Sequence, residues 1–283
     1  MKEALKLSGI GRPLDFNCAT NRAVFILSAA VSVAGFGCRM LRNGGTVQSL
    51  LWGLGAGAGV FLAWALGREV DPDHDLSAFT AAGLALVGIF LWGIPGLGLL
   101  FWLLAGVRIV NRTTGLAPTV VDSMVFIGLG GWMSFRGHWI AGLLTFAALF
   151  SDGFLPRGKR RQMIFAAMGA AVSAAGFILG GKGTGRAHIS WEIGLVLLAA
   201  FLFLPVIMES RDMKSGMDES DEILISSRVQ AAQSFAGLFL ILTALWGGKA
   251  GLVPLIPAWA AVVGAGIRKR ITSLKIAGGF GKR

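Results

Sequence analysis

The sequence has few charged residues and only two cysteines. Charged side chains make up 14% of the 283 residues, whereas an ordinary soluble domain carries about 25%. Hydrophobic residues make up 54%, and the mean hydropathy is +0.70. This composition excludes a disordered chain, a secreted disulfide scaffold and a soluble enzyme domain. It is typical of a chain that uses lipid as its solvent.

The common catalytic and metal-binding motifs are also missing. Cys18 and Cys38 flank the first apolar run, so we expect them at opposite ends of one membrane helix, too far apart for a disulfide. There is no CxxC pair and no Cys/His cluster, so a zinc or iron–sulfur site has no support. A Ser/His/Asp set, a Walker loop and a dinucleotide fingerprint are absent as well. Catalytic residues therefore cannot be assigned from motifs.

The apolar residues fall into ten segments separated by mostly short polar loops. Several segments are shorter than the roughly 20 residues that usually cross a bilayer core. We nevertheless predict an all-α fold, a polytopic integral membrane helical bundle with about ten transmembrane helices. The segments are residues 23–41, 47–67, 78–93, 95–110, 118–135, 138–151, 162–180, 190–208, 229–247 and 251–268.

The predicted organisation is a single transmembrane domain, residues 23–268, between two cytoplasmic ends. Residues 1–22 lack the apolar core of a signal peptide, so the first spanning helix is expected to act as the insertion signal. Residues 269–283 form a basic tail, and residues 209–228 form a charged cytoplasmic loop.

The uncharged stretch 78–107 decides the topology. As one helix it would be about 45 Å long, more than a bilayer core of about 30 Å needs. The sequence Gly93-Ile94-Pro95-Gly96 in its middle is typical of a turn. With a hairpin there, twenty Lys and Arg residues share the side of the two termini and six lie opposite. The positive-inside rule therefore predicts ten spans, with both termini in the cytoplasm.

Four carboxylates lie within seven residues between the second and third segments. Glu69, Asp71, Asp73 and Asp75 can point several oxygens at one hard cation, such as Mg²⁺ or Ca²⁺. We take them as candidate metal ligands, and a cation held there could bind a diphosphate. The alternative is a solvated turn that begins at Asp71-Pro72.

Two arginines after the fourth segment are candidate substrate-binding residues. Arg108 and Arg112 are four residues apart, on one face of a helix end, and Asn111 lies beside Arg112. Guanidinium groups at a membrane surface bind phosphate well. The alternatives are ion pairs with the carboxylates of residues 71–75, or contact with anionic headgroups.

Asp122 completes the candidate substrate-binding set. Asp122 and Glu192 are the acids that we place inside predicted spans, where ionisable groups are rare. For Asp122 the alternative is a capping box with Thr119, three residues earlier. Glu192 has a similar explanation, because a helix N-terminus favours negative charge.

The glycines and tryptophans are expected to serve packing and anchoring. Gly53, Gly55, Gly57 and Gly59 alternate along the second segment, and small residues let helix backbones approach closely in lipid. Tryptophans near segment ends are expected to anchor the helices at the membrane surface. These are Trp52, Trp92, Trp102, Trp139, Trp191 and Trp246.

Three functions remain open at this point. The first is a small-solute transporter or permease with a charged cytoplasm-facing site, by architectural analogy with compact drug/metabolite-type exporters. The second is a divalent-metal-dependent membrane enzyme acting on a lipid or isoprenoid phosphate. The third is a non-catalytic subunit or scaffold of a larger complex, with partners at residues 209–228 and the termini.

The expected setting is the inner or plasma membrane, with anionic lipid headgroups as partners of the basic residues. The formal charge of +11 would suggest nucleic acid in a soluble protein. Here the interleaving of aromatic and basic residues that RNA binding uses is absent, so no nucleic acid is expected.

Overall fold

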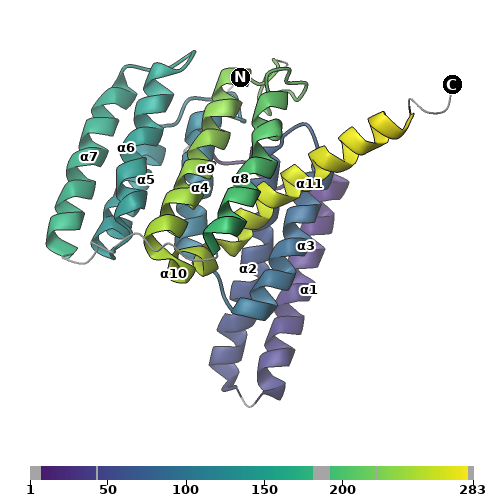
Figure 1. Cartoon of the computed structure of the whole chain (residues 1–283). Helices are drawn as coiled ribbons and strands as arrows, with labels where there is room; N and C mark the ends of the chain where they lie inside the picture. The colour runs from purple at the N-terminus through teal and green to yellow at the C-terminus, as the bar shows by residue number, and fades with distance from the viewer. Residues whose placement is uncertain (1–7, 43, 181–191, 221, 280–283) are drawn as a thin grey trace. The chain divides into compact units, whose positions relative to one another are not determined.

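The protein is all-α in the computed structural model, which describes residues 8–42, 44–180, 192–220 and 222–279, with side chains as far as residue 274. In lipid a helix satisfies its own backbone hydrogen bonds, which is why the apolar segments fold this way. The helices (Figure 1) are α1 (Ala19–Leu41), α2 (Thr46–Val70), α3 (Asp75–Trp92), α4 (Leu97–Asn111), α5 (Val120–Phe135), α6 (Trp139–Phe154), α7 (Arg161–Gly180), α8 (Glu192–Glu209), α9 (Ser226–Gly247), α10 (Lys249–Leu252), the 3-10 turn η1 (Val253–Leu255) and α11 (Ile256–Gly279).

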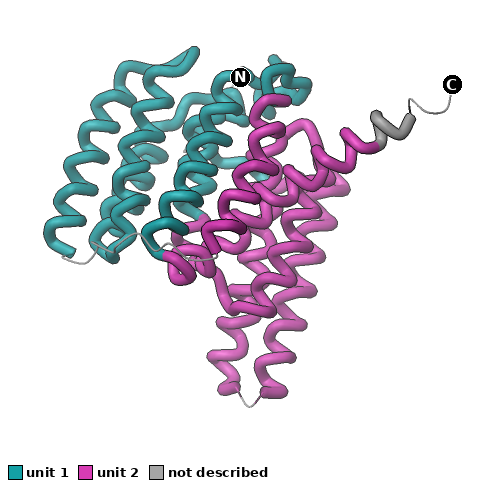
Figure 2. The backbone as a smooth tube through the Cα atoms, viewed as in Figure 1, with its two compact units in different colours: residues 1–13, 101–188, 210–247 teal, residues 14–100, 189–209, 248–283 magenta. Residues whose placement is uncertain are grey.

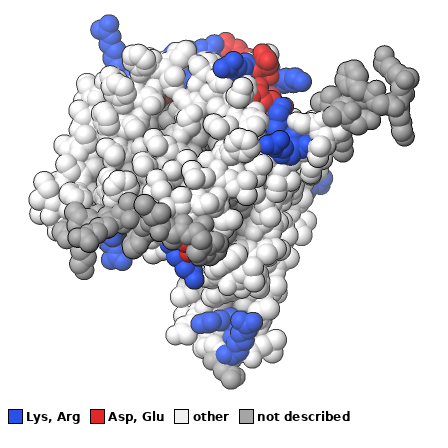
Figure 3. All heavy atoms as spheres, viewed as in Figure 1, with Lys and Arg blue, Asp and Glu red and all other residues white. Residues whose placement is uncertain are grey.

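The helices confirm the predicted membrane bundle. Among the described residues, seven helical segments are long and apolar enough to cross a membrane: α1, α2, α3, α7, α8, α9 and the run Lys249–Leu274. Helices α4, α5 and α6 are apolar but only 15 or 16 residues long. Figure 3 shows a broad uncharged surface, with charged side chains gathered near its edges. The protein is an integral membrane protein.

The stretch 78–107 forms two helices separated at residues 93–96, where the sequence predicted a turn. Helix α3 ends at Trp92, and Gly93 has φ +105°, a conformation that only glycine adopts easily. Gly96 N donates to Pro254 O at 2.9 Å, and α4 begins at the next residue. The turn is therefore set by glycine conformation and fixed by a hydrogen bond to the segment before α11.

The chain divides into two compact units (Figure 2). Unit 1 comprises residues 1–13, 101–188 and 210–247, and unit 2 comprises residues 14–100, 189–209 and 248–283. In unit 1, α5, α6 and α7 pack against one another and α9 packs on α6. In unit 2, α2, α3 and α11 pack together, with α1 on α2 and α8 on α11. The boundary falls within α4, between Leu100 and Phe101.

Glycines bring α1 and α2 into close contact in unit 2. A Cβ added at Gly57 would overlap the Ser32 hydroxyl and the carbonyl oxygen of Ser28. A Cβ at Gly53 would overlap the carbonyl oxygen of Ser32. The packing role predicted for these glycines is confirmed, because a larger residue would force the two backbones apart.

Trp102 corrects the anchoring prediction for the tryptophans. It is fully buried in unit 1, where its ring lies 4.8 Å from that of Phe239 and 5.6 Å from that of Phe126. Its Nε1 donates to Thr145 Oγ1 at 3.0 Å. Trp102 is a core residue because other helices cover the face of α4 on which it lies. Its position along the apolar segment does not reveal this burial. Trp191 lies outside the described residues.

Candidate binding site

Unit 1 contains a pocket of about 210 Å³ between α4, α5 and residues 8–11. Arg108 and Asp122, two of the predicted substrate-binding residues, lie in its lining. The rest of the lining is mainly apolar and includes Phe101, Leu104, Val121, Val125, Phe126 and Leu129. The structure thus brings together two residues that the sequence singled out separately.

This α4–α5 pocket has a polar end and an apolar end. Arg108 lies in the last turn of α4, and Phe101 lies seven residues earlier, about 10 Å along the helix axis. On α5 the lining extends from Asp122 in the first turn to Leu129, a similar distance. Phe101 and Val125 are each 53% exposed, so part of the apolar wall is also protein surface. Such a shape suits a molecule with one charged end and one hydrocarbon end.

Asp122 holds the N-terminal segment at the polar end of this pocket. Its carboxylate accepts hydrogen bonds from Ser8 Oγ at 2.6 Å and from Gly9 N at 2.7 Å. The Thr119 backbone and hydroxyl donate to the same carboxylate, and the Thr119 hydroxyl accepts from Asp122 N, so the capping box is confirmed. Thr114 Oγ1 donates to Gly9 O at 2.6 Å. The geometry favours a positioning role for Asp122 in this wall.

Arg112 does not share a helix face with Arg108. Helix α4 ends at Asn111, and Arg112 has φ +53°, in the left-handed region. Arg112 forms a two-point ion pair with Asp152, with Nε to Oδ1 at 2.6 Å and Nη2 to Oδ2 at 2.9 Å. The expectation of one shared face is wrong, because the helix ends before the second arginine. Asn111 is also buried, at the end of α4.

Arg112, Asp152 and Arg228 form a buried ionic cluster in unit 1. Arg228 Nη1 donates to Asp152 Oδ1 at 2.8 Å, and Arg228 also donates to the carbonyl oxygens of Pro156 and Val110. Asp152 is fully buried and Arg228 is 1% exposed. These contacts join the C-terminal ends of α4 and α6 to the first turn of α9.

Sequence reasoning missed this buried ionic cluster. It placed Asp152 just beyond the sixth span, whereas the structure places it inside α6. It assigned Arg228 to the charged cytoplasmic loop, whereas the structure places it in the first turn of α9. The available signal was weak: a single acid at the end of an apolar run, with no indication of which arginines face it.

The four candidate metal ligands lie in unit 2, where Asp71 contacts an arginine and a histidine. Asp71 Oδ2 accepts from Arg268 Nε at 2.9 Å, and Asp71 Oδ1 lies 3.0 Å from His74 Nδ1. Arg268 also donates to Glu209 Oε2 at 2.8 Å. The Asp71 carboxylate therefore fastens α11 to the end of α2.

The other three carboxylates differ in how far they are exposed to solvent. Glu69 is fully buried, Asp73 is half-buried, and Asp75 is exposed with Arg68 Nε at 3.9 Å. Within the part of the chain that the structure describes, no group of three or more His, Cys, Asp or Glu side chains could hold a metal ion. A Mg²⁺ or Ca²⁺ site at Glu69–Asp75 remains a prediction without a geometric argument behind it.

The charged loop 209–228 is hydrogen-bonded to other segments of unit 1, although most of its described residues are exposed. Asp218 N donates to Thr113 O at 3.1 Å, and Arg12 Nη2 donates to Asp218 Oδ1 at 2.7 Å. Met217, Leu224 and Val229 form a small apolar cluster beneath the loop. Protein partners at this loop and at the termini remain a prediction.

The fold and the α4–α5 pocket define a class: a helical integral membrane protein with a pocket that is charged at one end and apolar at the other. No protein-family model, no curated protein and no solved structure matches the chain.

Proposed function

We propose that the protein is a transporter of a small amphiphilic anion and that the α4–α5 pocket is its binding site. The observation that carries this proposal is the lining, which passes from Arg108 to Phe101 over about 10 Å. A guanidinium attracts a phosphate or carboxylate, and the apolar end favours burial of a hydrocarbon tail. A volume of about 210 Å³ lies below the usual range of about 300–1,000 Å³ for ligand pockets, so the tail is short.

The charge distribution supports a cytoplasmic position for the Arg108 end. Arg108 belongs to the side that carries twenty of the Lys and Arg residues in the predicted topology. The same rule supports placement in an inner or plasma membrane, where the basic residues meet anionic headgroups. The substrate then enters or leaves the pocket from the cytoplasmic surface.

The other two functions have less support from the geometry. The predicted enzyme needs the carboxylates of residues 69–75 to hold a metal ion and the arginines around residue 108 to bind the same phosphate group. Instead, Asp71 is bound by Arg268 and Arg112 is bound by Asp152. A scaffold could use the loop 209–228, most of whose described residues are exposed, but no feature of these residues points to a particular partner.

Uptake of hexyl phosphate by the full-length chain in proteoliposomes tests the proposal. We expect saturable uptake and binding of hexyl phosphate, with much weaker binding of inorganic phosphate and hexyltrimethylammonium. Arg108→Gln is expected to raise the Kd for hexyl phosphate about tenfold, because a hydrogen bond to a charged group contributes about 1.5–3 kcal/mol. Leu104→Trp, which fills the pocket, is expected to abolish uptake.

Arg160→Gln is the matched control, because Arg160 is an exposed arginine of the same unit outside the pocket lining. Equal weakening by Arg108→Gln and Arg160→Gln would reject the pocket as the site. Binding that depends on Arg108 but is unaccompanied by uptake would reject transport.

A further inference from the structure

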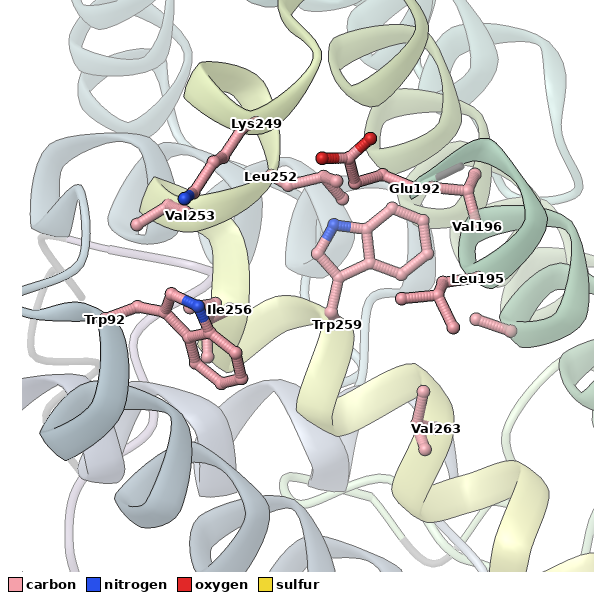
Figure 4. A pocket seen from close by; sticks show the side chains of 11 residues that line it. Trp92, Glu192, Leu195, Val196, Lys249, Leu252, Val253, Ile256, Trp259 and Val263 are labelled. Carbon is pink, nitrogen blue, oxygen red and sulfur yellow. The ribbon is translucent and has the colours of Figure 1, made fainter. Parts of the chain in front are cut away.

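Unit 2 contains a second pocket, of about 310 Å³, formed by α3, α8, α10, η1 and α11 (Figure 4). Its lining is almost entirely apolar and includes the indoles of Trp92 and Trp259. The two charged side chains in the lining are Glu192 and Lys249, which begin α8 and α10. None of these residues belongs to the α4–α5 pocket, so this second pocket is independent of the proposed function.

The second pocket is also polar at one end. In Figure 4, Glu192 and Lys249 lie on the same side of the Trp259 ring, and Val263 lies on the other. The lining runs seven residues along α8, from Glu192 to Ala199, which is about 10 Å. The lining therefore carries one carboxylate and one ammonium on the same side of the Trp259 ring, and the rest of it is mainly apolar.

Trp259, one of the lining residues, has a polar atom without a hydrogen-bond partner among the described residues. Its Nε1 is buried and finds no hydrogen-bond acceptor within the described part of the chain. A buried N–H group without an acceptor costs roughly 1–3 kcal/mol, so a ligand that brings a carbonyl oxygen gains by binding here. Indole rings also favour the boundary between headgroups and acyl chains.

We propose that this pocket binds a phospholipid with an ammonium headgroup, drawn from the surrounding bilayer. Lys249 attracts the phosphate, and Glu192 attracts the ammonium group. Trp259 Nε1 donates to an ester carbonyl, and one acyl chain lies along α8 and α11. The opposite charges in the lining match a zwitterionic headgroup, whereas an anionic headgroup would meet Glu192 unfavourably.

Native mass spectrometry of the full-length chain, released from nanodiscs of equal phosphatidylethanolamine and phosphatidylglycerol, tests this assignment. We expect about threefold preferential retention of phosphatidylethanolamine, in line with the energy of partly exposed ion pairs. Glu192→Gln is expected to remove the preference, and Lys249→Gln to lower retention of both lipids. Trp259→Phe keeps a ring but loses the donor, so it is expected to lower retention of both lipids.

Arg42→Gln is the matched control, because Arg42 is an exposed cation of unit 2 outside the pocket. Equal retention of the two lipids by the unaltered chain would overturn the proposal, as would an unchanged preference in Glu192→Gln. Release of the protein without either lipid would have the same meaning.

Quenching of tryptophan fluorescence by phosphatidylethanolamine with brominated acyl chains gives a second, independent measurement. If the brominated acyl chain enters the pocket, Trp259→Phe is expected to reduce the fraction of tryptophan fluorescence that is quenched. No reduction would contradict the proposed position of the acyl chain.

Discussion

At the scale of single residues, the balance of buried charge in unit 1 depends on Asp152. Its carboxylate faces two guanidinium groups, those of Arg112 and Arg228, with almost no exposure to solvent. Burying charge is costly unless each group has partners. Here Arg228 obtains them from Asp152 and from the carbonyl oxygens of Pro156 and Val110. The cluster is stable as a set, so the loss of one member leaves the others poorly compensated.

Asp152→Asn is expected to destabilise the protein by about 3–5 kcal/mol, because two buried guanidinium groups lose their counter-charge. Thermal or denaturant unfolding in detergent measures this change. Asp75→Asn, at an exposed carboxylate, is the control and is expected to change stability by less than about 0.5 kcal/mol. A double-mutant cycle with Arg228→Met measures the coupling between Asp152 and Arg228. If the losses in free energy of unfolding simply add in the double variant, the proposed coupling is contradicted.

At the scale of helices, close backbone contact through glycine holds α1 against α2. Lipid removes most of the gain from burying large apolar side chains between helices, so tight packing contributes instead. Gly53 and Gly57 allow the contact, because their missing Cβ atoms leave room for the backbone and side chain of Ser32. On α3, Gly83 faces open space and has no such role.

Gly57→Ala and Gly83→Ala form a matched pair that separates packing from helix propensity. At Gly57 the new methyl group overlaps Ser32, so we expect a loss of about 1–3 kcal/mol. At Gly83 the same change meets nothing within 4 Å, so we expect a gain of up to about 1 kcal/mol from helix propensity. Melting temperatures in detergent distinguish the two, and losses of similar size at both sites would contradict the packing explanation.

At the scale of the whole molecule, the distribution of charge predicts the orientation in the membrane. The break at residues 93–96 separates α3 from α4. Ten spans then follow if the shorter helices α4, α5 and α6 also cross. Charge counting places both termini in the cytoplasm.

The two native cysteines test this topology, because they lie near opposite ends of α1 and both are exposed and free. A hydrogen bond with the Thr20 hydroxyl, with help from nearby backbone N–H groups, lowers the pKa of the Cys18 thiol and so favours its reactive thiolate. In sealed vesicles, we expect an impermeant maleimide to label Cys18 from the cytoplasmic side in Cys38→Ser. Cys38 in Cys18→Ser should react from the opposite side.

A cysteine introduced at Ile94 in a cysteine-free background extends this labelling test to the predicted hairpin. It is expected to react from the same side as Cys38. Labelling from the side of Cys18 would rule out the ten-span arrangement.

The sequence by itself determined the class of fold, the positions of ten helices and the break at Gly93. It succeeded because these properties are local: lipid forces each apolar run to satisfy its own backbone hydrogen bonds. The capping box at Asp122 was predictable for the same reason, since its partner Thr119 lies three residues away. The close contacts of the α2 glycines followed from composition.

Only the tertiary structure decided which charged residues meet. Asp152 is 40 residues from Arg112 and 76 from Arg228, and Asp71 is 197 from Arg268. The spacing of Arg108 and Arg112 suggested one face, but the helix end at Asn111 separates them. Ion pairing depends on distance in space and on where each helix ends, and neither quantity is encoded in a local pattern. The α4–α5 pocket depends on the same long-range contacts, because Asp122 and Ser8 build one wall from positions 114 residues apart.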